Sequence, residues 1–182
     1  MFANPNAGLA APKIRYPDGT LQYVCRLLPS PHNVFLRRFF PNSKLAKRAD
    51  DSYELRWWDH NTIANIPFFQ ASFLLIRSTL LDVIEGFDER FFLYAEDIDI
   101  CRRIHQLADT LYVPDATIVH EFRRYSSRSL RGTLYSIRSH CQYFSKWGWF
   151  IDGARDEINF RTVRDLRTKR NIDSNSHQNT GR

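Results

Sequence analysis

The hydrophobic positions of this chain fall into two patterns, short apolar runs and stretches with helical spacing. The apolar runs predict strands over residues 9–14, 66–77, 110–113 and 117–119, with Pro114 and Asp115 between the last two. Helical spacing predicts a short helix over 78–84 that ends at Gly86, a helix that begins at Glu96, and a longer helix over 129–146. In the longer helix, apolar residues recur at 130, 134, 137, 141 and 144, which predicts an amphipathic helix with a basic outer face.

The length and composition suit one folded domain. The chain has 182 residues, of which 43% are hydrophobic, and this can support a core. The Arg- and Lys-rich stretch 33–51 is expected to form an exposed excursion of helix and loop, either simply solvated or bordering a cleft. The polar stretch 169–182 is expected to be disordered.

The charge and the cysteines of the chain argue against a nucleic-acid-binding protein and against a disulfide-rich one. The chain has 26 basic and 20 acidic side chains, a net charge of +6, and its arginines are dispersed, so no nucleic-acid-binding stripe is evident. The three cysteines are widely spaced without a Cys-x-x-Cys pair, which favours reduced thiols in the cytoplasm. No signal peptide or membrane-spanning run is visible, so we expect a soluble or peripheral protein.

The segment 86–103, GFDERFFLYAEDIDICRR, holds the clearest candidate chemistry. An aromatic approach leads into three carboxylates, those of Glu96, Asp97 and Asp99, at the start of a predicted helix. Helical spacing places Glu96 and Asp99 on one face and turns Asp97 about 100° away, where it could look into a cleft as a general base. The alternative is an ordinary acidic helix start, in which Asp99 pairs with Arg103 and Glu96 with the first-turn amides.

Two adjacent tryptophans, Trp57 and Trp58, form a second unusual cluster. Neighbours on a strand point to opposite sides, so both rings cannot face one core. One ring could line a sugar-binding pocket, since aromatic faces suit sugar C–H groups, and ordinary packing is the alternative.

The segment 71–103, ASFLLIRSTLLDVIEGFDERFFLYAEDIDICRR, resembles the acceptor-side motif of inverting family 2 glycosyltransferases, in particular their rhamnosyltransferase-like branch. Two further pieces fit in the same order: NPNAGLAAPKIRYPDGTLQ over 4–22, and Ile118-Val119-His120, which is similar to the strand-end histidine of that family. The resemblance covers roughly residues 4–150.

The resemblance implies an α/β fold, an incomplete mixed sheet of the GT-A class flanked by helices. Residues 1–150 would be the acceptor-side part of the domain, 151–168 a helical extension and 169–182 a tail. In these enzymes a sugar-nucleotide half with an Asp-x-Asp metal motif lies before the segment that 4–22 resembles. We therefore expect the acceptor-side half without its donor-binding half.

The resemblance also implies roles for individual residues. Asp97 matches the general base, Glu96 would orient the acceptor or hold the helix start, and Asp99 would brace Arg102 or Arg103. His120 matches the histidine that helps to hold a divalent cation, Mn²⁺ or Mg²⁺, when a donor half is present. In that family, the region of Arg123, Arg124 and Arg128 is a lid over the leaving diphosphate, so these side chains would bind the diphosphate. From the residues themselves, Trp57, Trp58, Ala71 and Ser72 are expected to contact the acceptor.

The leading hypothesis is sugar transfer from a nucleotide sugar to a glycan or polyprenyl-linked acceptor for a bacterial surface polysaccharide. A cytoplasmic location is expected, with peripheral contact at the inner face of the membrane, because the aromatic run 147–151 follows a basic helix. The main alternative is a non-catalytic module that binds a glycan or a partner chain through an open sheet edge. A metal-dependent hydrolase built on Glu96, Asp97, Asp99 and His120 is a more distant option.

Overall fold

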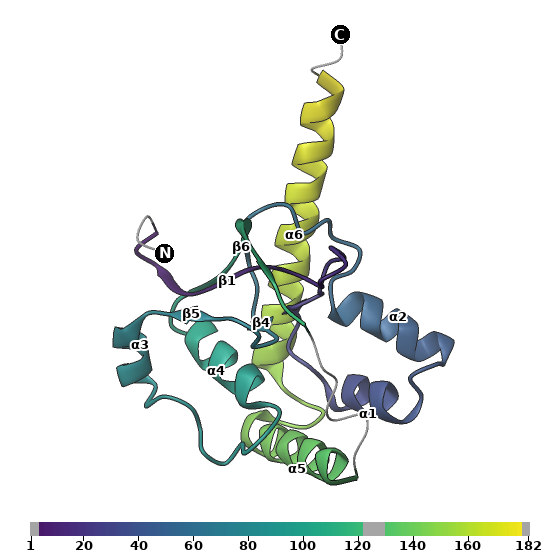
Figure 1. Ribbon diagram of the computed structural model, residues 1–182, viewed down its shortest axis with the longest axis vertical. Coiled ribbons are helices and arrows are strands. Elements are labelled where there is room, and N and C mark those ends of the chain that lie inside the picture. Colours follow the sequence, from purple (N-terminus) through teal and green to yellow (C-terminus); the bar gives the residue numbers. More distant parts are fainter. Residues whose placement is uncertain (1–3, 122–129, 180–182) are drawn as a thin grey trace.

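The computed structural model describes residues 4–121 and 130–179, with side chains up to residue 171 (Figure 1). Its centre is a four-stranded mixed sheet in the order β3-β6-β1-β5. The long strands β1 (Ala7–Arg15) and β6 (Asp109–Val119) run parallel. The short strands β5 (Leu75–Ile76) and β3 (Ala64–Asn65) pair antiparallel with them at the two edges. A separate two-stranded sheet joins β2 (Cys25–Arg26) to β4 (Phe68–Phe69).

Helices flank the sheet, which confirms the predicted α/β class. They are α1 (Pro31–Phe39), α2 (Lys44–Tyr53), α3 (Ser78–Val83), α4 (Glu96–His105), α5 (Leu130–Trp147) and α6 (Gly153–Asn179). Helix α4 packs against β1, β4 and β6 through the buried side chains of Ile98, Ile100, Cys101 and Ile104. The start of α4 is thereby fixed against the body of the protein. Within the described residues, no helix is both long enough and apolar enough to cross a bilayer.

The strand predicted over 66–77 is wrong as one continuous element. Its first part forms β4 and its last part forms β5, because the two ends bond to different neighbours. The backbone N–H of Gln70 donates to the carbonyl of Val24 (3.0 Å), whereas that of Arg77 donates to the carbonyl of Gly8 (2.9 Å). The residues between β4 and β5 turn from one sheet to the other, and this turn passes the start of α4.

The two strands predicted around Pro114 and Asp115 form one strand, β6. Its register against β1 shifts, since Pro12 pairs with Val113 and Lys13 pairs with Thr117. The extra residues bulge and keep the pairing on both sides, so the proline does not end the strand.

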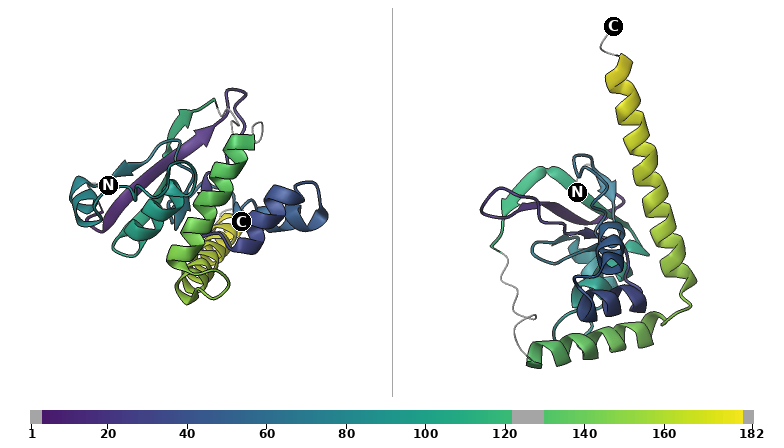
Figure 2. Two further views of the ribbon diagram at one scale, coloured as in Figure 1. Left: turned by 90° about the horizontal axis from the view of Figure 1, so that it is seen from below. Right: turned by 90° about the vertical axis from the view of Figure 1, so that its right-hand side faces the viewer.

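The C-terminal region also differs from the prediction, because α6 is helical up to Asn179 where disorder was expected from residue 169. The helix begins after Asp152, which accepts hydrogen bonds from the N–H groups of Arg155 and Asp156. After Gly153, neither proline nor glycine interrupts the helix before its end. Figure 2 shows α6 standing out beyond the sheet. The division of the chain into domains remains a prediction.

Helix α5 is present as predicted, but its outer face is not the basic one expected. The residues that it buries against the body are Gly132, Ser139, Tyr143 and Phe144. Four of the five predicted apolar positions point outward instead, namely Leu130, Leu134, Ile137 and Cys141. The apolar stripe therefore lies on the exposed face of the helix.

Candidate functional site

The candidate site begins at a backbone turn directly before α4. Tyr94 and Ala95 both have left-handed conformations, with φ of 69° and 65°. Such conformations cost non-glycine residues of the order of 1–3 kcal/mol each, and in proteins they cluster at functional sites. Ala95 is the N-cap and has no side chain that could accept from the first-turn N–H groups. The carboxylates that follow therefore lie at a helix start, where the helix dipole favours negative charge and the first-turn N–H groups need acceptors.

Asp97 is half-buried and is held by two backbone N–H groups. Its Oδ2 accepts from Ala71 at 3.3 Å and its Oδ1 accepts from Ile98 at 2.9 Å. Burial raises the pKa of Asp97, and the hydrogen bond from Ala71 and the charge of Arg26 offset only part of that effect. A carboxylate with a raised pKa holds a proton more readily than a solvated one, which suits a general base.

Glu96 lies beside Asp97 and has an unusual environment. Its Oε2 is buried and, among the described residues, has no hydrogen-bond partner. Burial raises the pKa of Glu96, and the neighbouring charge of Asp97 raises it further. Buried polar atoms are almost always hydrogen-bonded, so an unpartnered carboxylate oxygen here suits contact with a bound hydroxyl. The pair thus combines an unpartnered buried oxygen on Glu96 with a carboxylate, Asp97, that accepts from the first-turn N–H of Ile98.

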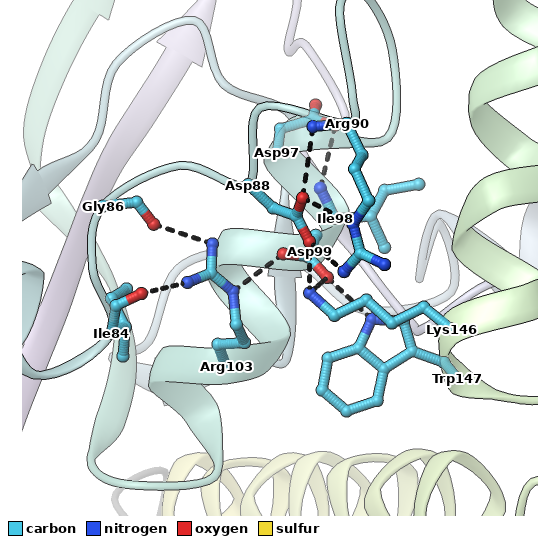
Figure 3. A network of polar contacts seen from close by, with 10 residues as sticks. All are labelled: Ile84, Gly86, Asp88, Arg90, Asp97, Ile98, Asp99, Arg103, Lys146 and Trp147. Carbon is cyan, nitrogen blue, oxygen red and sulfur yellow. Dashed lines mark hydrogen bonds and ion pairs between the residues drawn. The ribbon is translucent and has the colours of Figure 1, made fainter.

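Asp99 has a structural role, and its predicted pairing with Arg103 is confirmed. The carboxylate is fully buried and accepts from Arg103 Nε at 2.7 Å and from Trp147 Nε1 at 2.7 Å, and Lys146 Nζ lies 2.7 Å away (Figure 3). The Arg103 guanidinium also donates to the carbonyls of Ile84 and Gly86. Asp99 thus joins α4 to the end of α5 and to the loop after α3.

Lys146 extends this network to Asp88 of the Gly-Phe-Asp-Glu segment. Its Nζ lies 2.8 Å from Asp88 Oδ2, and the same carboxylate accepts from Arg90 Nη2 at 2.6 Å (Figure 3). Hydrogen bonds from Arg90, and then from Lys146, hold the pKa of Asp88 well below its usual range. The segment before α4 is therefore anchored by charge as well as by its aromatic residues.

Arg102 forms a second buried bracket. Its guanidinium makes two parallel hydrogen bonds to Asp152, at 2.7 and 2.8 Å, and donates to the Tyr143 hydroxyl at 3.1 Å. The guanidinium also lies over the ring of Trp147, 4.2 Å from its centre. Because Asp152 precedes α6 and Tyr143 lies on α5, this bracket fixes both helices to α4. Of the charged residues at 96–103, only Glu96 and Asp97 form no ion pair within the described part of the chain.

Arg26 and Tyr53 lie close enough to Asp97 to interact with its charge, but no sequence pattern predicts their place in the site. Arg26 lies on β2, donates to the Gln70 side chain at 2.7 Å and pairs with Glu54 at 3.1 Å. The buried ring of Tyr53 lies under this guanidinium, whose centre is 5.7 Å from the ring centre. Since Gln70 precedes Ala71, Arg26 brings a positive charge to the turn that contacts Asp97. Only the folded chain brings these residues together, so local patterns could not indicate them.

The residues predicted to contact the acceptor divide into two groups. Ala71 is exposed and bonded to Asp97, with Ser72 next to it. Trp58 is only 4% exposed and packs against His60 and Tyr112, which favours the packing alternative. The half-buried Trp57 carries the guanidinium of Arg167 from α6 over its ring. Acceptor contact by either tryptophan remains a prediction.

The predicted metal and diphosphate residues lie at the end of β6 or beyond it. His120 donates its backbone N–H to the carbonyl of Arg15, and its Nδ1 is 3.3 Å from Gln22 Oε1. Across residues 4–121 and 130–171, no three His, Cys, Asp or Glu side chains gather as a metal site would require. The predicted diphosphate ligands lie outside the described residues, namely Arg123, Arg124 and Arg128.

Comparison with known sequences finds distant relatives that are all named as rhamnosyltransferases. No family model matches the chain, and no solved structure matches it. The N-acetylglucosaminyl-diphospho-decaprenol L-rhamnosyltransferase of Mycobacterium tuberculosis, found in two strains, is 30% identical over 126 residues. The Rhamnosyltransferase WbbL of Escherichia coli K12 is 36% identical over 84 residues. The chain is similar to rhamnosyltransferases.

The similarity to these relatives covers only part of each protein. The match to the mycobacterial protein covers 64% of this chain and 38% of the relative, and the match to the E. coli protein covers 44% and 31%. The chain thus spans well under half the length of these relatives. Similarity to two rhamnosyltransferases supports a glycosyltransferase relationship, in agreement with the sequence motifs.

Proposed function

We propose that this protein takes part in inverting sugar transfer, with a nucleotide sugar as donor and a polyprenyl-diphosphate-linked sugar as acceptor. Rhamnose is the proposed sugar, because both named relatives are rhamnosyltransferases. The diphospho-decaprenol in the name of the mycobacterial relative suggests the acceptor class. The GT-A assignment belongs to the same proposal and rests on the motifs at 71–103.

The observation that carries the proposal is the difference in ion pairing among the charged residues at the start of α4. Asp99, Arg102 and Arg103 form buried ion pairs that stabilise the fold. Asp97 forms no ion pair within the described residues, remains half-buried beside the exposed Ala71, and has a raised pKa. A carboxylate that only stabilises a helix start acts through its negative charge. The raised pKa of Asp97 disfavours that charge, and this favours a chemical role for Asp97.

The reaction is a single displacement. The acceptor hydroxyl oxygen attacks the anomeric carbon of the donor, and the new C–O bond forms as the bond to the nucleoside diphosphate breaks. The hydroxyl proton passes to Asp97, and the bonding electrons leave with the diphosphate. Glu96, with its unpartnered Oε2, would accept a hydrogen bond from another acceptor hydroxyl and so orient the sugar.

A divalent cation would neutralise the leaving diphosphate, but the described residues do not fit a complete cation site. His120 could supply one ligand, and no group of three suitable side chains surrounds it among residues 4–121 and 130–171. A calorimetric titration with dTDP, with and without Mn²⁺, tests this ligand. Binding that depends on Mn²⁺ and disappears in His120→Ala would support it, whereas binding unchanged in the variant would remove it.

The proposed function is tested by measuring acceptor binding and transfer separately. Calorimetry with a soluble analogue of N-acetylglucosaminyl diphosphate lipid reports binding, and mass spectrometry reports product after dTDP-rhamnose is added. Binding with product supports the transferase. Binding without product supports the non-catalytic glycan-binding alternative, and absence of acceptor binding contradicts both.

A further inference from the structure

The outward face of α5 is an apolar stripe with no packing partner in the described structure. Leu130 is 85% exposed and Leu134 66%, and Ile137 and Cys141 continue the same line at helical spacing. At 1.5 Å per residue, the stripe runs for about 16 Å along the helix. A soluble helix normally turns such a stripe toward the core, so this one is available to another apolar surface.

Further apolar side chains are exposed on the segments next to α5. Phe150 and Ile151 follow α5 directly and are 79% and 93% exposed. Phe92, from the loop before α4, is also exposed and packs its ring against that of Tyr135 on α5, with ring centres 5.3 Å apart. Figures 1 and 2 show α5 lying across the end of the molecule opposite to the end of α6. These exposed apolar residues therefore belong to α5 or to segments that contact or directly follow it.

The charge on this helix is of one sign. Helix α5 carries Arg131, Arg138 and Lys146 and has no Asp or Glu. Arg131 and Arg138 are exposed beside the stripe, whereas Lys146 is engaged with Asp88 and Asp99. The neighbouring α1, linked to α5 by a hydrogen bond from Arg38 to Thr133, also has no acidic residue. Exposed acids lie on neighbouring segments: Glu89 lines a groove with Arg90 and Arg138, and Asp156 and Glu157 lie on α6, where they pair with Arg155 and Arg161.

From these observations we propose that the outer face of α5, with Phe92, Phe150 and Ile151, docks onto an anionic lipid bilayer. An apolar stripe flanked by arginines is the pattern of helices that lie in a membrane interface. The stripe would enter the acyl boundary while Arg131 and Arg138 contact lipid phosphates. We call this set of residues the α5 surface.

A second copy of the chain is a poorer occupant of the α5 surface. A symmetric pair would bring two helices of the same positive charge together, with no acidic residue on either to compensate. An anionic bilayer supplies both the apolar contact and the opposite charge. Docking on a bilayer would bring the protein to the lipid-linked acceptor proposed above, and in this respect the inference rests on the proposed function.

Vesicle co-sedimentation of the 182-residue chain tests the proposal without donor or acceptor. The vesicles contain phosphatidylcholine alone or equal parts of phosphatidylcholine and phosphatidylglycerol. Leu130→Glu/Leu134→Glu alters the stripe, and Arg131→Gln/Arg138→Gln alters its charge. The matched control is Leu45→Glu/Val83→Glu, at two similarly exposed apolar positions on α2 and α3.

The expected result is binding to the anionic vesicles that falls by on the order of tenfold or more in the stripe variant and also falls in the charge variant. Binding by the control variant should match that of the unaltered chain. Lack of vesicle binding by the unaltered chain, or equal loss in the control, would overturn the proposal. A dimer in light scattering that the stripe variant dissociates would overturn it in favour of a second copy.

Failure of this proposal and failure of the proposed function are distinguishable. Vesicle binding without sugar transfer would leave the α5 surface in place and remove the enzyme. Transfer to a soluble acceptor analogue without vesicle binding would keep the enzyme and remove the α5 surface.

Discussion

Asp97 and Asp99 lie two residues apart on the first turn of α4, yet substitution by asparagine should affect protein stability very differently at the two positions. Asp99→Asn should destabilise the protein strongly, because the buried carboxylate accepts from Arg103 and Trp147 and also pairs with Lys146. Asparagine keeps one oxygen and puts an NH₂ group where these donors converge. Asp97→Asn should be nearly neutral for folding.

The magnitudes follow from the contacts. Breaking a buried charge pair costs about 3–5 kcal/mol, and the retained amide oxygen of asparagine places Asp99→Asn near the lower end, at about 3 kcal/mol. For a domain of this size, that corresponds to a fall in melting temperature of about 6–12 °C. The folded state already disfavours the ionised form of Asp97, whose pKa is raised. Losing one of its two backbone hydrogen bonds should therefore cost about 1 kcal/mol or less.

Urea denaturation and thermal melts followed by circular dichroism at pH 7 measure both free energies of unfolding. Asp51→Asn is the matched control, since Asp51 is exposed and its closest ion-pair contact, to Arg56, is 3.9 Å long. It should change stability by less than about 0.5 kcal/mol. Equal destabilisation by Asp97→Asn and Asp99→Asn would refute the assignment of separate roles, as would an Asp99→Asn variant as stable as the control.

Further predictions concern pH and packing. Burial lowers the pKa of His60 to about 4, so the free energy of unfolding should fall as pH drops from 6.5 toward 4, by about 2 kcal/mol at pH 5 from this group. His60→Asn, which tolerates the positive φ of 57° at this position, should reduce that slope in urea melts at pH 7 and pH 5. Gly8→Ala should cost about 1–3 kcal/mol, because its Cβ would lie 2.4 Å from Leu80 Cδ1, while Gly153→Ala meets nothing within 4 Å and should be neutral or stabilising. Arg102→Lys should lower the melting temperature, since lysine cannot make two parallel bonds to Asp152.

The elements that sequence patterns predicted well are those determined by local spacing. The acidic turn and apolar positions from Glu96 fixed the start of α4, and the Gly86 stop signal agreed with the end of α3 at Val83. The pairing of Asp99 with Arg103 also followed from helical spacing, since these residues are four apart.

The features that escaped prediction depend on contacts between distant segments. The apolar run 66–77 divides because its ends bond to Val24 and Gly8, which no local pattern reveals. Helical periodicity located the stripe on α5 but could not say whether it faces a core or a bilayer, since both are apolar. The face that α5 buries instead carries Gly132, Ser139, Tyr143 and Phe144. Arg26 likewise reaches the neighbourhood of Asp97 only through the pairing of β2 with β4.

The most direct test of the central claim is the turnover number for rhamnosyl transfer when Asp97→Asn is made in an active, complete form of the protein. It is measured at a temperature where this variant and Asp99→Asn are both folded, with acceptor affinity followed in parallel. Loss of the general base should lower kcat by about 10²–10⁴-fold while acceptor binding stays near that of the unaltered protein. The Asp99→Asn variant should retain most of its turnover once it is folded. Turnover in Asp97→Asn close to that of the unaltered protein would contradict the account.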